Sequence, residues 1–302
     1  MTDQNTAEKL KGVIPALITP MGESGNIDYS SLEKQTAYLC EADIAGLFIN
    51  GTTGEGAYLS TSKKVEVLSI VKSVAKKDMI VCAGCIKPST VEVIEELTAF
   101  EKVGVDFLVA VSPYYLKVSQ EVMLTHFREI ATSASVPLII YNIPQNTNNP
   151  LGFGTIKELI GIDNVAGIKD SSGNFIDFSR GVLCTSNSSF VWIQGEDLLD
   201  AAAYLIGAKT VVTGLGNVWI DPYIEMSQAA HQGDRIGVLE AQKKINALVE
   251  IVECAPGKGI SAIKAACSLL GRSKLGMSIP ALRVNTRELN KIKCIVEGLQ
   301  LL

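Results

Sequence analysis

The chain has 302 residues, of which 47% are hydrophobic and 20% are charged, as is typical of a packed globular protein. Its net charge of −5 argues against a broad basic face, and therefore against nucleic acid or an anionic membrane as the main partner. The polar N-terminus lacks the apolar core of a signal peptide, and no apolar run is long enough to span a membrane, so we expect a cytoplasmic protein.

Eight short apolar runs alternate with amphipathic segments along the chain. The runs are rich in Val, Ile and Leu and do not alternate with polar residues, which is typical of parallel strands buried on both faces. In chain order they cover residues 13–18, 46–50, 79–83, 107–111, 138–141, 165–169, 191–194 and 210–213.

The segments between these runs predict helices. Residues 65–74 and 94–100 repeat apolar positions at helical spacing. Ser89 and Glu92 have the spacing of a capping box, and Asp221 is expected to cap a helix whose first residue is the proline that follows it. Eight strand–helix units in order predict an α/β fold, the (β/α)8 TIM barrel. The main alternative, an open doubly wound sheet, more often has fewer strands and a GxGxxG turn, which is absent here.

Residues 233–302 follow the eighth unit and predict further helices over 238–252, 260–270 and 286–301. We therefore assign residues 1–232 to a barrel domain and residues 233–302 to a C-terminal helical extension. The extension is too long for a simple tail, so we expect it to pack on the barrel or on a neighbouring subunit.

Cysteines and histidines give little support to a metal or redox site. The seven cysteines are scattered, which predicts reduced thiols. Cys82 and Cys85 have CxxC spacing, but they end an apolar run instead of opening a helix, and no second ligand pair exists. His126 and His231 lie far apart in helical-looking segments, and no GxSxG motif is present. Both histidines are interpreted as ordinary packing or surface residues.

Lys169 is the most informative polar residue, because it ends the sixth predicted strand. In a barrel of this kind the carboxyl ends of the strands carry the chemistry. Desolvation at the barrel mouth disfavours a lysine ammonium, and a free amine can attack a ketone to form an imine. The alternative is a solvated lysine, which is the usual state of this residue type.

Two tyrosines and two threonines follow other predicted strands. Tyr141 and Tyr115 could relay protons beside an imine, or could merely cover the barrel. Thr52 and Thr53 lie between glycines, where hydroxyl and backbone N–H groups can bind a carboxylate. A plain tight turn is the alternative for this segment, which is not a Walker loop.

Four ordered motifs and the N-terminal segment together resemble a known family over nearly the whole chain. The segment GVIPALITP covers residues 12–20, and the motifs are GTTGE at 51–55, SPYY at 112–115, YNIP at 141–144 and GIKDSSG at 167–173. They are similar to those of the dihydrodipicolinate synthase / N-acetylneuraminate lyase family of pyruvate-handling aldolases.

The resemblance implies that Lys169 forms a Schiff base with the 2-keto group of pyruvate and that Tyr141 shuttles protons. It also implies that Thr53 links Tyr141 to Tyr115, which in this family often reaches across a subunit interface. The family is usually a homotetramer, a dimer of dimers, and uses no metal or organic cofactor.

The resemblance also implies a set of binding positions. Thr52 and Thr53 would hold the pyruvate carboxylate through backbone N–H and hydroxyl groups. The candidate positions in the wall around the substrate are Ala16, Gly195 and Val212. Glu196, with Asp197, could bind sugar hydroxyls.

One position departs from the family pattern. Dihydrodipicolinate synthases usually carry an arginine two residues after YNxP, where this chain has Asn146. Asn cannot replace a bidentate cation, so we expect a neutral, hydroxylated aldehyde, as in 2-keto-3-deoxy sugar acid aldolases. The first alternative is 4-hydroxy-tetrahydrodipicolinate synthase, which condenses pyruvate with aspartate semialdehyde, and the next are a dehydratase or N-acetylneuraminate lyase. Two further alternatives are a non-catalytic barrel that binds pyruvate or a sugar acid, and a metal-dependent aldolase.

Overall fold

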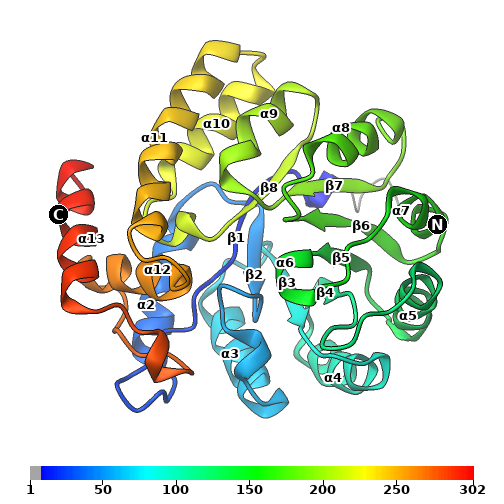
Figure 1. The fold of residues 1–302 in the computed structure, drawn as a ribbon, viewed down its shortest axis with the longest axis horizontal. Helices are drawn as coiled ribbons and strands as arrows, with labels where there is room; N and C mark the ends of the chain where they lie inside the picture. The colour runs from blue at the N-terminus through cyan, green and yellow to red at the C-terminus, as the bar shows by residue number, and fades with distance from the viewer. Residues whose placement is uncertain (1–7) are drawn as a thin grey trace.

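The structure, a computed structural model, describes residues 8–302, so most of the polar N-terminal stretch lies outside it. Within this range eight parallel strands form one sheet in the order β1-β8-β7-β6-β5-β4-β3-β2, and the sheet curves into a barrel (Figure 1). A parallel bridge between Ala16 and Phe48 joins the two ends of the sheet. This confirms the (β/α)8 barrel and excludes the open sheet.

The strands agree closely with the predicted runs. They are β1 (Gly12–Pro15), β2 (Gly46–Ile49), β3 (Ile80–Cys85), β4 (Phe107–Val111), β5 (Leu138–Asn142), β6 (Val165–Asp170), β7 (Val191–Gln194) and β8 (Thr210–Thr213). β3 runs two residues beyond its predicted end, because Gly84 and Cys85 continue the pairing with β4. β1 is shorter than predicted, because only the isolated bridge at Ala16 continues it.

Most of the helices surround the strands on the outside of the barrel (Figure 1). Those of the barrel are α2 (Tyr29–Glu41), α3 (Thr61–Val74), α4 (Thr90–Val103), α5 (Gln120–Ser133), α6 (Pro144–Thr147), α7 (Phe153–Ile160), α8 (Phe175–Cys184), α9 (Asp200–Leu205) and α10 (Asp221–His231). Short 3-10 turns occur at η1 (Gly56–Tyr58), η2 (Asp197–Leu199) and η3 (Leu215–Asn217).

Two predicted helix starts differ in detail. Ser89 caps α4, but the Glu92 carboxylate accepts from the Ser89 hydroxyl (2.8 Å) and not from its N–H, so only half of the capping box forms. The cap residue of α10 is Ile220, and Asp221 is already helical. The Asp221 carboxylate is engaged elsewhere, since it accepts from the Trp219 indole N–H (3.1 Å).

Three helices follow the eighth unit, as predicted. They are α11 (Arg235–Glu253), α12 (Gly259–Leu269) and α13 (Thr286–Gly298), with a 3-10 turn, η4 (Pro280–Leu282), before the last. α11 packs along α10, α12 packs on α11 and η3, and α13 packs on α11 and α12. They lie on one side of the barrel, at the left of Figure 1. The division between residues 232 and 233 stays a prediction.

Buried side chains form an inner layer inside the barrel and an outer layer between strands and helices. Cys82 belongs to the inner layer and Cys85 to the outer one, so the two thiols lie on opposite faces of β3. Burial raises the pKa of both thiols far above its ordinary value. This geometry rules out a shared redox or metal site at the CxxC spacing.

Asn217 fastens the last unit to the first. This residue of η3 is fully buried, its side-chain oxygen accepts from the Ile18 N–H (3.1 Å), and its amide donates to the Ala16 carbonyl (2.7 Å). Gln35 of α2 donates in turn to the Asn217 carbonyl (2.9 Å). The carboxyl ends of β1 and β8 are therefore held together at the barrel mouth.

Across residues 8–302, no helix is both long enough and apolar enough to cross a membrane. In the same part of the chain, no three His, Cys, Asp or Glu side chains gather in a way that could hold a metal ion.

His126 gives the fold a testable pH dependence. It is buried, with Nε2 3.0 Å from the Val111 carbonyl and Nδ1 2.8 Å from the Thr90 hydroxyl. Burial lowers the pKa of His126 from 6.5 to about 4. The unfolded chain therefore takes up a proton between these two values, whereas the folded chain does not. The contribution of His126 to the stability of the fold is therefore fully present at neutral pH and is lost as the pH falls from 6.5 to about 4.

We predict that protonation of His126 in the unfolded chain lowers the free energy of unfolding by roughly 3 kcal/mol as the pH falls from 6.5 to 4. His126→Gln should lack this component in urea unfolding measured across that range. His231→Gln, at an exposed position, is the matched control and should keep the pH dependence of the unaltered chain. Identical pH profiles for all three proteins would contradict the assignment.

Candidate active site

Lys169 and Tyr141 lie side by side at the carboxyl ends of β6 and β5. The parallel register of these strands pairs the two residues directly. Lys169 Nζ lies 3.8 Å from the centre of the Tyr141 ring and 5.2 Å from the centre of the Phe48 ring. Both Lys169 and Tyr141 are buried, with exposed fractions of 6% and 2%. A buried amine against two aromatic faces excludes the alternative of a solvated lysine.

The Lys169 side chain lies over the apolar interior of the barrel. A cavity of about 10 Å³ beneath it is lined by Ile14, Phe48, Cys82, Val109, Ile139, Lys169, Ile193 and Val212. Val212 and Ala16 both belong to the inner layer of buried side chains. They therefore occupy the inner wall, as the resemblance implied, although contact with a substrate stays a prediction for both.

The Tyr141 phenol has an altered acidity. Burial alone would raise its pKa, but the positive charge of Lys169 and hydrogen bonds with Lys169, Thr52 and Ser171 outweigh burial and lower the pKa of Tyr141. A phenol whose pKa lies closer to the working pH transfers protons more effectively in both directions. The pair can thus supply an amine nucleophile and an adjacent proton carrier.

Thr52, and not Thr53, approaches the Tyr141 hydroxyl. The distance between Thr52 Oγ1 and the Tyr141 oxygen is 3.5 Å. Thr53 points instead toward the loop after β8, where a methyl group on Gly214 would lie 3.2 Å from Thr53 Oγ1. The resemblance implied that Thr53 links Tyr141 to Tyr115, whereas within the chain the hydroxyl beside Tyr141 is that of Thr52. The link to Tyr115 stays a prediction. The backbone dihedrals of the turn decide which hydroxyl faces the phenol.

Tyr115 does not join the other site residues within the chain. Its side chain is 92% exposed, and its backbone has φ of +81°, a left-handed value that is costly for a residue other than glycine. Its neighbour Tyr114 is half-buried instead, with its hydroxyl 3.5 Å from the Ile86 carbonyl. A role for Tyr115 therefore requires a second subunit, which stays a prediction.

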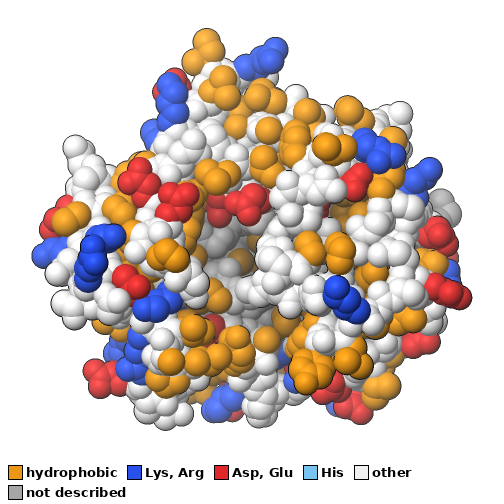
Figure 2. Space-filling view, in the orientation of Figure 1, with side chains coloured by type: hydrophobic (Ala, Val, Ile, Leu, Met, Phe, Trp, Pro, Cys, Tyr) orange, Lys and Arg blue, Asp and Glu red, His pale blue; other side chains and the backbone are white. Residues whose placement is uncertain are grey.

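The turn after β7 places carboxyl groups at the mouth. Gln194 Oε1 accepts from the N–H groups of Gly195 and Glu196 (both 3.0 Å) and so shapes the turn. The Asp197 carboxylate accepts from the Tyr223 hydroxyl (2.7 Å). Burial raises the pKa of the Glu196 carboxyl, and the neighbouring Asp197 charge adds to this effect. Figure 2 shows the central hollow of this face, with acidic side chains along its rim.

Ser171 is a site residue that the sequence analysis missed. It is buried, its hydroxyl donates to the Gly195 carbonyl (3.0 Å), and it also hydrogen-bonds with Tyr141. Strand periodicity could have revealed it, because residues two apart on a strand point to the same face and Ser171 follows Lys169 by two.

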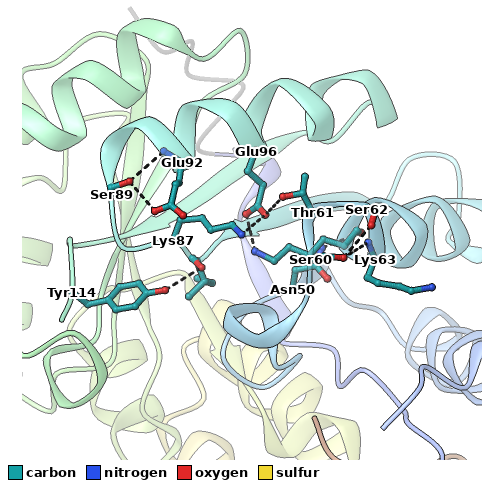
Figure 3. A network of polar contacts seen from close by, with 12 residues as sticks. Asn50, Ser60, Thr61, Ser62, Lys63, Lys87, Ser89, Glu92, Glu96 and Tyr114 are labelled. Carbon is teal, nitrogen blue, oxygen red and sulfur yellow. Dashed lines mark hydrogen bonds and ion pairs between the residues drawn. The ribbon is translucent and has the colours of Figure 1, made fainter. Parts of the chain in front are cut away.

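A second feature outside the sequence analysis is a buried charge network behind the turn that carries Thr52 and Thr53. Lys64 and Glu96 form an ion pair (2.7 Å) with exposed fractions of 0% and 1%, and Lys87 approaches the other Glu96 oxygen (3.5 Å). Asn50, which starts the turn with φ of +58°, donates its side-chain amide to the Lys64 carbonyl (3.2 Å). Figure 3 shows this network between α3 and α4.

The close approach of Gly195 to Lys169 gives a test of the site geometry. A methyl group at position 195 would lie 2.3 Å from Ser171 Oγ and 2.9 Å from Lys169 Cε. Gly195→Ala should therefore displace the amine and slow its reaction with a keto acid by about 100-fold, as misplacement of a reacting group by about 1 Å does. Gly154→Ala is the control, because a methyl group there meets nothing within 4 Å. Equal rates of imine formation in both variants would contradict this geometry.

Comparison with known proteins agrees with this arrangement. The model of the Dihydrodipicolinate synthetase family matches residues 9–299. The 4-hydroxy-tetrahydrodipicolinate synthase of Neisseria meningitidis is 34% identical over 290 residues, which cover 96% of this chain and 98% of the relative. The name of this relative is that of the alternative given above, 4-hydroxy-tetrahydrodipicolinate synthase, and not that of a 2-keto-3-deoxy sugar acid aldolase.

Solved structures give the same result. Dihydrodipicolinate synthase from Acinetobacter baumannii, complexed with pyruvate, superposes with a TM-score of 0.92 at 28% identity, covering 97% of this chain and all of that one. A Ruminococcus gnavus sialic acid aldolase superposes with a TM-score of 0.90 at 24% identity over 97% of this chain and 96% of that one, a likeness of fold. With its full-length match to the family model and its relatives above 30% identity, the chain belongs to the dihydrodipicolinate synthetase family.

Proposed function

We propose that Lys169 of this pyruvate-dependent Schiff-base aldolase forms the imine with pyruvate, and that Tyr141 carries the protons of the reaction. The observation that supports both roles is the pairing of a buried amine with a buried phenol across adjacent strand ends. Covalent catalysis of this kind divides one difficult step into easier ones.

The steps follow from the positions of the two groups. The unprotonated Lys169 amine attacks C2 of pyruvate. Tyr141 gives its proton to the carbonyl oxygen and takes up the proton that the nitrogen loses, which yields the carbinolamine. Tyr141 then protonates the carbinolamine hydroxyl, which leaves as water, and a protonated imine remains. This imine withdraws electrons, and C3 loses a proton to the Tyr141 phenolate to form an enamine. The enamine carbon bonds to the aldehyde carbon, whose oxygen takes the proton from Tyr141, and the protonated imine forms again. Water adds to this imine and returns a proton to Tyr141, and the carbinolamine collapses to release the product from Lys169. The reverse sequence cleaves the same bond.

The turn with Thr52 and Thr53 is the proposed site for the pyruvate carboxylate. It follows β2 directly, and Thr52 already lies beside the Tyr141 hydroxyl. Backbone N–H groups and hydroxyls in such a turn can hold an anion without a metal or a basic side chain. With its carboxylate there, pyruvate would present its keto carbon between the turn and Lys169.

For the aldehyde, the residues of this chain favour an uncharged, hydroxylated compound that forms a 2-keto-3-deoxy sugar acid. Asn146 is exposed where the resembling synthases carry arginine, so no cation is supplied at that position. The Glu196 carboxyl in the turn after β7 can accept hydrogen bonds from hydroxyl groups, whereas its negative charge, with that of the buried Asp197 beside it, disfavours a second carboxylate.

The second candidate partner is aspartate semialdehyde. It is supported by the relatives named 4-hydroxy-tetrahydrodipicolinate synthase, which are 30% to 35% identical to this chain. The homotetramer that the resemblance implies also remains a proposal, and the exposed position of Tyr115 is compatible with it.

Reduction with borohydride in the presence of pyruvate should attach the three-carbon acid covalently to Lys169, as read by peptide mass spectrometry. Lys169→Ala should give no adduct, and Tyr141→Phe should slow adduct formation by about 100-fold, the usual contribution of a general acid–base group. Lys64→Met is a control for removal of a buried lysine outside the barrel mouth. An adduct that persists in Lys169→Ala would contradict the role of this amine.

A panel of aldehydes incubated with pyruvate tests the partner. We expect consumption of pyruvate to be about tenfold faster with glyceraldehyde than with aspartate semialdehyde, because a charge-assisted hydrogen bond worth about 1.5–3 kcal/mol is missing for the second carboxylate. Asn146→Arg should raise the rate with aspartate semialdehyde, whereas Asn146→Gln should leave it unchanged. A wild-type preference for aspartate semialdehyde would establish the second candidate, and binding of pyruvate without turnover of any aldehyde would indicate a non-catalytic barrel.

A further inference from the structure

The C-terminal extension reaches the barrel mouth through one buried ion pair. Lys264 of α12 donates to the carboxylate of Glu55, and both side chains are 1% exposed. Lys264 also donates to the Gly276 carbonyl (3.1 Å), and the second Glu55 oxygen accepts from the Ser278 N–H (2.8 Å). The two charged groups thus pair with each other, and each also hydrogen-bonds to the backbone of the segment between α12 and η4.

Glu55 belongs to the turn that carries Thr52 and Thr53. Its backbone N–H donates to the Thr52 carbonyl (3.0 Å), and its φ of +56° is left-handed. A residue other than glycine keeps such a conformation only where its surroundings hold it firmly. The hydrogen bonds to Lys264 and Ser278 provide that constraint, so they fix the geometry of the turn itself.

The extension also approaches the loop after β8, next to the turn. A methyl group at Gly214 would lie 3.2 Å from Thr53 Oγ1 and 3.4 Å from Ile263 Cδ1, so Thr53 and Ile263 of α12 both border Gly214. Ile263 and Lys264 are consecutive in α12, and both are buried. One turn of this helix therefore contacts Glu55 through Lys264 and borders, through Ile263, the same glycine as Thr53.

We propose that Lys264 is a positioning residue for pyruvate, acting through Glu55 to hold the carboxylate-binding turn in its working geometry. This inference rests on the proposed carboxylate site at Thr52 and Thr53. It assigns the extension a part in substrate binding, since a change in the packing of α12 is transmitted to the turn through the buried Lys264–Glu55 ion pair. Lys264 does not touch the reacting atoms, so its effect falls on pyruvate affinity and not on the covalent step.

The experiment measures borohydride trapping of pyruvate as a function of pyruvate concentration. Lys264→Met should raise the half-saturating concentration at least tenfold while leaving the trapping rate at saturation within twofold of wild type. The matched control is Lys258→Met, which removes another ion-paired lysine of the extension, whose partner is Glu288 of α13 (2.9 Å) and not a residue of the turn. It should shift half-saturation less than twofold.

A double variant separates positioning from stability, because Lys264→Met leaves a buried carboxylate unpaired and can impair folding. Glu55→Gln with Lys264→Met removes both charges, so thermal unfolding should return toward the wild-type temperature. The half-saturating concentration should nevertheless stay raised more than fivefold. If pyruvate affinity recovers together with stability, or if Lys264→Met matches Lys258→Met, the positioning role is wrong. If wild type itself traps no pyruvate, the proposed function fails instead.

Discussion

The register between β5 and β6 is the constraint on which the site depends. It pairs Tyr141 with Lys169, and a slip of one residue would turn every side chain of the strand to the opposite face. The register is in turn fixed by burial on both faces, because β5 and β6 are fully buried strands between the inner and outer layers. The chemistry of the amine therefore follows from the packing of the barrel, and no separate element is needed to bring the two residues together.

Around this pair, the chain contributes three kinds of support. The turn after β2 offers hydroxyl and N–H groups, and the turn after β7 offers carboxyl groups. Asn217 fastens η3 to the segment that follows β1. Some of these groups are held by side chains far away in the sequence, such as Glu55 by Lys264, 209 residues later. Segments that are distant in the sequence therefore meet at this end of the barrel.

Much of the fold and part of the site could be predicted from the sequence. Short Val- and Ile-rich runs marked the strands, and the position of Lys169 at the end of one run marked it as the candidate amine, which the structure places beside Tyr141. The sequence could not show that Thr52 rather than Thr53 faces Tyr141, because this depends on the dihedrals of one turn. Nor could it pair Lys264 with Glu55, since local patterns carry no information on contacts between such distant residues. The aldehyde partner is a further example, because the residues at the rim and the names of the relatives favour different compounds.

The most direct test is a crystal structure of the wild-type protein soaked with pyruvate and left unreduced. We predict continuous electron density between Lys169 Nζ and C2 of pyruvate, with the carboxylate against the Thr52–Thr53 turn and the Tyr141 hydroxyl beside the new bond. Pyruvate bound elsewhere, or lying in the mouth with Lys169 unmodified and turned away from its keto carbon, would contradict the central claim.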